Sequence, residues 1–194
     1  MEINRYHIQS PTEVIKLQLG IPQDYKQQCI EEIYRLGDSM NHKSNIKAIM
    51  TSYFIWEESN KFDILLDNIS NILNSNLIEV SKNQLIIENA WGAIYKKNNF
   101  TLPHLHNPSL ISFVYYLKSS GNTPLVFDET SLKFFPQDDT LIIFPSHLMH
   151  SVPPHNEEND RICIAGNCTV NPEQFVPSYY LPRKQRIKKT INQT

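Results

Sequence analysis

The hydrophobic pattern of the chain changes its period near residue 84, and this change constrains the fold more than any other feature of the sequence. Before it, apolar residues recur every three or four positions, which is typical of amphipathic helices. After it come short runs rich in Val, Ile, Phe and Tyr, separated by turn residues, which is typical of strands. Runs of helices followed by runs of strands indicate an α+β protein. We therefore expect a helical region over residues 1–80 and a strand-rich core over residues 84–170.

Two segments of the first region carry the helical signal. "QDYKQQCIEEIYRLG" follows Pro22, has an apolar stripe and reaches Gly37 as a stop. "SNKFDILLDNISNIL" has a second stripe behind a cap at Ser59 or Asn60. Such stripes bury one face of a helix against a larger body. The sequence therefore predicts helices that buttress one sheet of the core, and this region is also a candidate surface for a homodimer.

The second region reads as a series of short strands. They are "QLIIENAWGAIY", "LISFVYYL", "TPLVFD", "DTLIIFP" and "RICIAGN". Many short strands at near-regular spacing are typical of a sandwich or of a jelly-roll barrel. A chain of 194 residues, 40% of them hydrophobic, is large enough to bury such a core. We expect a single domain over residues 1–182 and a basic flexible tail over residues 183–194.

Composition limits the partners and the compartment. A net charge of −2 argues against a nucleic-acid-binding protein, and only the tail "PRKQRIKKTINQT" could bind a phosphate or a partner. Three cysteines without a C-x-x-C motif fit a reducing compartment. No apolar run reaches the length of a membrane span. We expect a cytoplasmic protein, or one of the host cytoplasm if the chain is viral.

A histidine pair marks a candidate metal site. His104 and His106 lie one residue apart in "PHLHNPSLISFVYYL", and such residues of an extended segment point to the same face. A third ligand is available in "FPSHLMHSVPPH", which contains His147, His150 and His155. We favour His150 because it follows an apolar strand and opens the next loop. Surface histidines and a zinc site are the alternatives for an H-x-H pair.

Arg161 is a candidate anion-binding residue. It begins the strand "RICIAGN", with Cys163 and Ala165 on its own face. A guanidinium binds a carboxylate through two parallel hydrogen bonds, so Arg161 beside small residues makes a slot for a planar carboxylate. The alternative is a strand-edge arginine paired with Glu158 or Asp160.

Over residues 84–170 these motifs resemble the iron(II)- and 2-oxoglutarate-dependent dioxygenases. The motifs, in order, are "WGAIY", "HLHNPSLISFVYYL", "GNTPLVF", "PQDDTLIIFPSHLMHSV" and "RICIAGN". The family has a double-stranded β-helix, or jelly-roll, fold with an H-x-D…H triad and an arginine after the second histidine. "H-x-H-N-P…YYL" is similar to the prolyl-hydroxylase branch. The whole is similar to a group of such oxygenases from tailed phages and marine bacteria, in which "SNIKAIMTS" also recurs.

The resemblance implies specific roles. His104 and His150 would bind iron(II), Arg161 and Tyr116 would bind the distal carboxylate of 2-oxoglutarate, and Tyr95 would line the cosubstrate pocket. Phe127 matches a position in the pocket wall only approximately. Dioxygen would complete the reactants, and decarboxylation of 2-oxoglutarate to succinate would accompany hydroxylation. The prolyl-hydroxylase likeness favours a peptide or protein side chain as substrate, and a small molecule remains open.

The chain departs from the family at His106, where most members have aspartate. Three neutral imidazoles leave the metal one unit more positive than the usual ligands do, and zinc and copper also suit imidazole. We expect His106 to be the third ligand, with a carboxylate from Asp128 or Glu129 as the alternative. Two other functions stay open, a three-histidine cupin-type metalloenzyme without 2-oxoglutarate and a non-catalytic jelly roll that binds a metal or ligand. Trp91 and Trp56 are predicted to be core residues, and a platform for the substrate is the alternative for each.

Overall fold

The structure, a computed structural model, describes residues 3–9, 12–37, 44–75, 85–130 and 132–171. Its strands are β1 (Ile3–Gln9), β2 (Thr12–Gln18), β3 (Ile46–Lys47), β4 (Ile49–Met50), β5 (Leu85–Tyr95), β6 (Phe100–His104), β7 (Ile111–Lys118), β8 (Leu125–Phe127), β9 (Leu132–Phe134), β10 (Thr140–Pro145), β11 (His150–Val152) and β12 (Arg161–Val170). Its helices are α1 (Gln23–Leu36), α2 (Ile55–Glu58) and α3 (Asp63–Leu73), with a 3-10 turn η1 (Asn60–Phe62) before α3.

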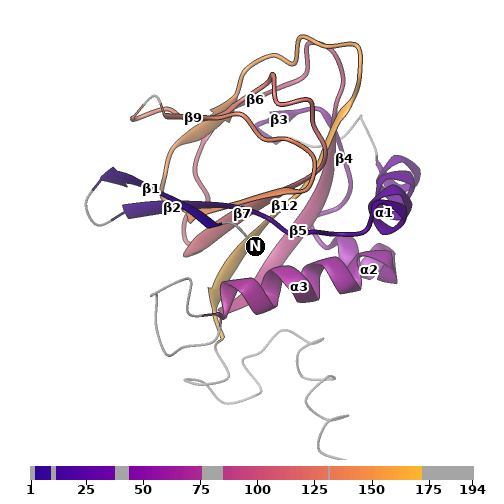
Figure 1. Ribbon diagram of the computed structural model, residues 1–194, viewed down its shortest axis with the longest axis horizontal. Coiled ribbons are helices and arrows are strands. Elements are labelled where there is room, and N and C mark those ends of the chain that lie inside the picture. Colours follow the sequence, from indigo (N-terminus) through magenta and orange to yellow (C-terminus); the bar gives the residue numbers. More distant parts are fainter. Residues whose placement is uncertain (1–2, 10–11, 38–43, 76–84, 131, 172–194) are drawn as a thin grey trace, which may run out of the picture.

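The strands form two antiparallel sheets that face each other (Figure 1). The larger sheet has the order β1-β2-β10-β7-β12-β5-β4, and the smaller has the order β3-β6-β11-β8-β9. The non-consecutive neighbours show that the chain crosses repeatedly between the sheets. This arrangement is the double-stranded β-helix, so the predicted fold class is confirmed.

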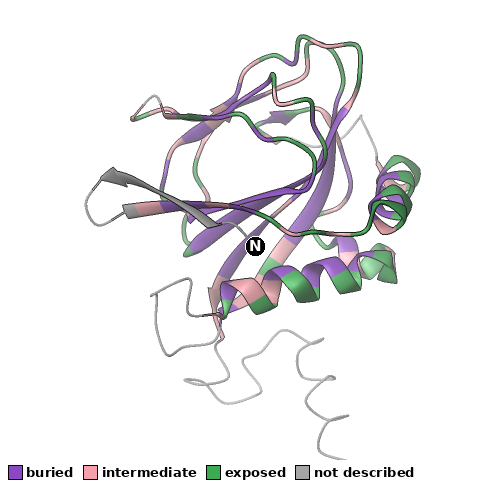
Figure 2. Ribbon diagram, viewed as in Figure 1, coloured by how far each residue is buried: buried purple, intermediate pink, exposed green. Residues whose placement is uncertain are grey.

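The larger sheet is covered on both faces. Along β7, Phe113 and Tyr115 pack in a cluster with the helices, whereas Val114 and Tyr116 pack in a second cluster between the sheets. Seven of the eight β7 residues are buried as a result (Figure 2). Strands buried on both faces read as continuous apolar runs, which explains why "LISFVYYL" shows little alternation.

The helices lie against the outer face of the larger sheet, as the apolar stripes predicted (Figure 1). α1 approaches β5 closely at Gly92, where a Cβ atom would lie 2.7 Å from the Ile33 side chain. Only glycine therefore permits this packing distance. In α3, Leu65, Leu66 and Ile69 are buried in the same cluster.

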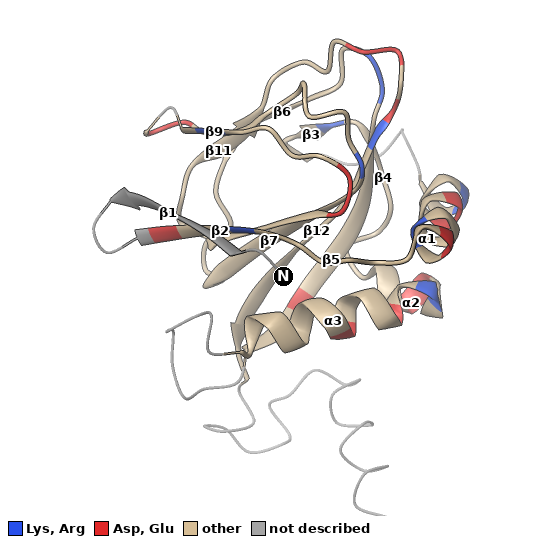
Figure 3. Cartoon of the chain, in the orientation of Figure 1, with Lys and Arg blue, Asp and Glu red and all other residues tan. Residues whose placement is uncertain are grey.

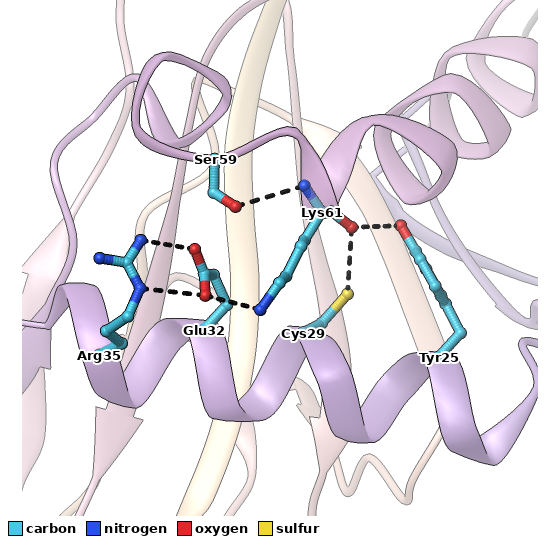
Figure 4. Close-up of polar contacts among 6 residues, drawn as sticks. All are labelled: Tyr25, Cys29, Glu32, Arg35, Ser59 and Lys61. Carbon is cyan, nitrogen blue, oxygen red and sulfur yellow. Dashed lines mark hydrogen bonds and ion pairs between the residues drawn. The ribbon is translucent and has the colours of Figure 1, made fainter.

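Polar contacts join α1 to the segment before α3 (Figure 4). The buried carboxylate of Glu32 accepts two hydrogen bonds from Arg35, at 2.6 and 3.1 Å, and one from Lys61 at 3.0 Å. The Tyr25 hydroxyl donates to the Lys61 carbonyl oxygen at 2.6 Å. These contacts fix the orientation of the two helical segments relative to each other.

The prediction that residues 1–80 are helical is wrong for part of this region. Residues 3–9 and 12–18 form β1 and β2, and residues 46–50 contribute two short strands. β2 pairs with β10, with Ile15 and Leu17 facing the helices and Val14 facing the interior of the barrel. The period-two signal is present in "EVIKLQL", but this segment lies before the period change that guided the prediction.

The predicted tail, residues 183–194, lies outside the described residues. Within the described ranges, no helix combines the length and the hydrophobicity that crossing a bilayer requires.

Candidate metal and carboxylate site

Three histidines converge at one end of the barrel interior. His104 and His150 lie opposite each other on the paired strands β6 and β11, and His106 follows two residues after His104. The ring centroids are separated by 4.3 Å for His104 and His150, 4.7 Å for His104 and His106, and 5.0 Å for His106 and His150. One nitrogen from each ring lies within 4.8 Å of the others, and the described residues contain no other group of this kind.

Backbone carbonyls orient two of the rings. Nδ1 of His104 lies 2.8 Å from the Leu102 carbonyl oxygen, and Nδ1 of His150 lies 2.8 Å from the Leu148 carbonyl oxygen. A carbonyl oxygen only accepts, so each Nδ1 carries the proton and each Nε2 keeps its lone pair. Metal-binding histidines usually have such a partner on the second nitrogen.

Burial keeps the three imidazoles neutral. It lowers the pKa of His104 below its ordinary value. The pKa of His106 falls to about 4 and that of His150 to about 3, because burial opposes the charged form and the neighbouring His104 adds to the effect. All three rings are thus neutral at neutral pH, with one nitrogen of each free of a proton, as metal binding requires.

The other candidate histidines do not join this group. His147 is exposed. His155 is buried in a loop, where Nδ1 lies 2.9 Å from the Thr123 hydroxyl and Nε2 lies 2.7 Å from the Asn159 carbonyl oxygen. Both of its nitrogens are therefore used in holding the loop.

The alternative carboxylates also lie outside the group of three. Oδ1 of Asp128 accepts a hydrogen bond from the Ser151 hydroxyl at 2.9 Å, and Glu129 is exposed. Oδ2 of Asp128 is buried and has no hydrogen-bond partner among the described residues, but neither carboxylate belongs to the group whose ligand atoms lie within 4.8 Å of one another.

Arg161 is a buried cation with an incomplete set of partners. Its side chain is 2% exposed, and Nη2 donates to the Tyr116 hydroxyl at 3.0 Å. Nε and Nη1 are buried and have no hydrogen-bond partner among the described residues. The guanidinium carbon lies 4.8 Å from the ring centroid of Tyr116 and 5.3 Å from that of Tyr95. Two aromatic rings thus enclose the charge without neutralising it.

The alternative of a strand-edge ion pair is wrong for Arg161. Glu158 pairs with Lys97, and Asp160 accepts a hydrogen bond from the Tyr34 hydroxyl. Both carboxylates therefore have partners on the outside of the barrel, whereas Arg161 points inward.

A pocket lined at one end by the three histidines extends to Arg161. Its walls between the two ends include Val114, Leu125, Phe144 and Val152. Cys163 and Ala165 line it on the same face of β12 as Arg161, as their spacing predicted. The remaining predicted residues lie in or near its wall. Tyr95 lines the pocket with its hydroxyl 2.6 Å from that of Thr101, and Phe127 packs behind it with its ring centroid 5.2 Å from that of Phe144.

The two ends of the pocket fit a divalent cation and a carboxylate. Three neutral imidazoles with free lone pairs suit iron, zinc or copper. The unpartnered nitrogens of Arg161, together with the Tyr116 hydroxyl, suit a carboxylate oxygen pair.

Trp91, for which the sequence favoured the core over a substrate platform, lies in the wall of this pocket. Trp91 is 3% exposed, as predicted for a core residue, but its Nε1 has no hydrogen-bond partner among the described residues. Its parity with Ala93 and Tyr95 on β5 was the available signal. Ser112 also faces the pocket, but its hydroxyl is hydrogen-bonded to Ser146 and Asn167, at 2.8 Å each.

Comparisons with known proteins agree with this geometry. The family described as "Putative 2OG-Fe(II) oxygenase" matches residues 126–167, a segment that contains His150 and Arg161. No curated protein gives a significant match.

Solved structures of three enzymes share the fold. The viral collagen prolyl hydroxylase of Paramecium bursaria Chlorella virus-1, with 2-oxoglutarate bound, is 16% identical, with a TM-score of 0.62 over 80% of this chain and 94% of that one. A Pseudomonas putida prolyl-4-hydroxylase is 15% identical, with a TM-score of 0.62 over 84% and 95%. HygX from Streptomyces hygroscopicus, with nickel and 2-oxoglutarate bound, is 13% identical, with a TM-score of 0.65 over 82% and 84%.

The match to the family model indicates the chemistry of a 2-oxoglutarate- and iron(II)-dependent oxygenase. The solved structures support the fold that this chemistry requires. Together they confirm the resemblance predicted from the motifs: residues 126–167 match a family of iron(II)/2-oxoglutarate-dependent oxygenases, and the chain has the fold of such enzymes.

Proposed function

We propose that His104, His106 and His150 bind iron(II) and that Arg161 and Tyr116 bind the distal carboxylate of 2-oxoglutarate. Tyr95 forms part of the same pocket wall. The proposed reaction couples decarboxylation of 2-oxoglutarate to hydroxylation of a second substrate. One observation carries this proposal: a buried guanidinium with two unpartnered nitrogens lies in the pocket at whose other end three imidazoles converge.

The energetics of Arg161 favour an anionic ligand. A buried charge without a counter-ion costs several kcal/mol. Arg161 has no carboxylate partner among the described residues, and its fork faces a pocket with apolar walls. A carboxylate in this pocket offsets the cost and accepts the unused N–H groups.

Charge balance favours a dianion beside this metal site. Three neutral histidines leave the two positive charges of a ferrous ion uncompensated, whereas the usual aspartate compensates one of them. 2-Oxoglutarate carries two negative charges: one would compensate part of the charge of the metal, and the other would pair with Arg161. A dianion therefore suits this pocket better than a monoanion does.

When bound, iron(II) and 2-oxoglutarate would supply the oxidising chemistry. One atom of dioxygen would go into succinate and the other into a C–H bond of the substrate, with release of carbon dioxide. The residues of the chain position these groups. Burial raises the pKa of Tyr116 to about 12, so its hydroxyl keeps its proton and can donate it to a carboxylate. The apolar walls exclude water from the reacting centre.

A peptide or protein side chain is the substrate class that we favour, because two of the similar structures are prolyl hydroxylases. A further solved structure, a prolyl hydroxylase from Trichoplax adhaerens, has a peptide fragment bound. All three cysteines are buried and free, which suits the reducing cytoplasm in which we place the protein. Dimerisation and the lack of nucleic-acid binding stay predictions from the sequence.

Anaerobic titration tests the proposal. Iron(II) and 2-oxoglutarate are added separately and together, and the visible charge-transfer absorption of the chelate is recorded. We expect a band that requires both additions, and in Arg161→Met we expect iron binding to persist while the band needs much more 2-oxoglutarate. Iron binding without a band at any 2-oxoglutarate concentration would favour a three-histidine enzyme of cupin type. A lack of stoichiometric iron binding would favour a non-catalytic jelly roll.

A further inference from the structure

A second polar group in the pocket lacks a partner, and it lies away from Arg161. Trp91 is on β5, where it pairs with Ala165 of β12, whereas Tyr95 pairs with Arg161. Four residues along a strand correspond to about 13 Å. The Trp91 ring centroid lies 5.9 Å from that of His106, so Trp91 belongs to the histidine end of the pocket. In the proposed function, 2-oxoglutarate directs one carboxylate to Arg161 and the other to the metal, so both of its carboxylates already have partners.

The indole N–H of Trp91 therefore needs an acceptor other than 2-oxoglutarate. Four buried side-chain atoms of the described residues have no hydrogen-bond partner: two in Arg161, one in Asp128 and Nε1 of Trp91. An indole nitrogen is only a donor, and a buried donor without an acceptor is costly. Because Trp91 lines the pocket and is 3% exposed, the missing acceptor is expected to arrive with a ligand.

The surroundings of Trp91 suit a neutral ligand. Among the described residues that line the pocket, the only acidic or basic side chain besides the three histidines is that of Arg161. Lys, Arg, Asp and Glu lie mainly on the helices and loops rather than on the strands around the pocket (Figure 3). A cationic or phosphorylated substrate would thus meet no counter-charge near Trp91.

The wall also favours one strong acceptor over many weak ones. Near Trp91 it offers Ala93 and Ala165, and the hydroxyl of Ser112 is already hydrogen-bonded. A sugar with many hydroxyls would lose more hydrogen bonds than this wall replaces. Each residue of a peptide presents only one amide carbonyl beside its side chain, and one such carbonyl matches one N–H in an apolar wall.

Aromatic contacts continue from Trp91 toward the surface. Tyr53 meets the Trp91 ring edge-on at 5.2 Å and is 40% exposed. Leu105, between the two histidines of the H-x-H pair, is 39% exposed. We infer that Trp91 is a substrate-binding residue whose indole N–H donates to an amide carbonyl of a neutral peptide segment bound past Tyr53. This inference rests on the proposed function and names the substrate class of the same site.

The chain offers an internal control, because Trp56 is its only other tryptophan. Trp56 lies on α2 and packs against the helical side of the larger sheet. A spectrum of the full chain labelled with ¹⁵N at the indole nitrogens therefore has two signals. The protein is loaded with zinc and 2-oxoglutarate, which prevents turnover, and is titrated with a panel of neutral blocked peptides that includes proline-containing members. Binding of 2-oxoglutarate to the same samples is measured by calorimetry.

We expect peptides of the panel to move the Trp91 signal downfield and to leave the Trp56 signal in place. For the tightest of them, Trp91→Phe should weaken binding about two- to tenfold, and Trp56→Phe should not weaken it. An analogue in which a trans alkene replaces the amide bond stays neutral and lacks the carbonyl, so it should bind more weakly than the parent peptide to the native protein and about equally to Trp91→Phe.

Two results would overturn the inference and leave the proposed function intact. One is normal 2-oxoglutarate binding with no movement of the Trp91 signal by any peptide, or movement only by a polyhydroxylated probe such as hygromycin B. The other is equal peptide affinity of the native protein and Trp91→Phe. A failure of 2-oxoglutarate itself to bind would remove the proposed function and the inference with it.

Discussion

Arg161 and Tyr116 form a hydrogen-bonded pair inside the barrel, with Nη2 of the guanidinium donating to the phenol hydroxyl at 3.0 Å and the charge lying 4.8 Å from the centre of the ring. The two residues come from the neighbouring strands β12 and β7. The contact orients the guanidinium but does not neutralise it, since the hydroxyl keeps its proton. The pair is therefore prepared for an anion that the chain itself does not provide.

Replacing the charge should separate ligand binding from stability. Arg161→Met removes a buried, unpaired cation, and an apolar group of similar volume at such a site is often neutral or stabilising. We expect the ligand-free variant to melt at the same temperature as the native protein or higher. Binding of 2-oxoglutarate should weaken about 10- to 100-fold, as expected for lost hydrogen bonds to a charged group. Thermal denaturation with and without 2-oxoglutarate measures both effects.

Lys118→Met is a suitable control for Arg161→Met, because Lys118 is exposed on the adjacent strand β7. It should change neither the ligand-free melting temperature nor the shift that 2-oxoglutarate produces. A strong loss of stability in ligand-free Arg161→Met would contradict the assignment of Arg161 as an unpaired cation.

Removing the phenol hydroxyl should have a smaller effect of the same kind. Tyr116→Phe leaves Nη2 of Arg161 without its acceptor and takes one donor from the pocket. We expect 2-oxoglutarate to bind about 3- to 20-fold more weakly, with metal affinity unchanged. Tyr95→Phe is the matched variant, because its hydroxyl is hydrogen-bonded to Thr101. Isothermal titration of both variants with metal and with 2-oxoglutarate compares their affinities. Equal losses of metal and 2-oxoglutarate affinity in Tyr116→Phe would indicate a general disturbance of the fold instead.

The sequence predicted the convergence at this site because strand parity is a local property. His104 and His106 share a face of an extended segment, and Arg161 shares a face with Cys163 and Ala165. The pairing of His104 with His150 required the order of the strands, and here the resemblance to a known family supplied what spacing alone left open.

The part that was not predicted depends on tertiary contacts. β2 lies inside the larger sheet and contributes buried residues to both of its faces, but these residues precede the change of hydrophobic period. The partners of His155 and of Oδ1 of Asp128 are a loop hydroxyl and a strand hydroxyl distant in sequence. The missing partner of Trp91 could be recognised only once its surroundings were known.

Protonation of the site should control the stability of the metal-free protein. In the unfolded chain, His106 and His150 take up protons below their ordinary pKa of 6.5, whereas in the folded protein their pKa values are about 4 and about 3. The unfolded state thus binds more protons between these values, so the free energy of unfolding should fall as the pH decreases from about 6.5 to about 4. Each histidine contributes at most about 1.4 kcal/mol per pH unit.

Chemical denaturation at pH 7.5, 5.5 and 4.5 measures this dependence. A His106→Gln variant should show a shallower decrease, and His147→Gln should match the native protein because His147 is exposed. Identical pH profiles for the native protein and His106→Gln would show that His106 is not held neutral by burial.

Restoring the carboxylate that most of the superfamily has should change metal selectivity. His106→Asp gives the ligand set of two histidines and one carboxylate that is typical of non-haem iron oxygenases. The added negative charge favours a hard divalent ion, so we expect the ratio of iron(II) to zinc affinity to rise about tenfold. The band that 2-oxoglutarate induces should persist. Competition titrations under anaerobic conditions give this ratio of affinities, and His147→Asp is the control. If His106→Asp bound no metal at all, the result would argue that the residue at position 106 does not face the metal.

The contacts around Glu32 should contribute to stability independently of the site. Glu32 joins Arg35 of its own helix to Lys61 of η1, and its carboxylate is buried (Figure 4). Hydrogen bonds from Arg35 hold its pKa at about 2, below the ordinary 4.5. Because the folded-state pKa is depressed, this contribution is complete above pH 4.5 and is lost as the pH falls toward 2. We expect Glu32→Gln to lower the free energy of unfolding by about 1–3 kcal/mol at pH 7 and by much less at pH 2.5.

Glu31→Gln on the exposed face of the same helix should have little effect at either pH. Urea denaturation of the three proteins at both pH values makes the comparison, and an equal loss at pH 7 and pH 2.5 would mean that packing of the side chain, rather than its charge, holds α1 to η1.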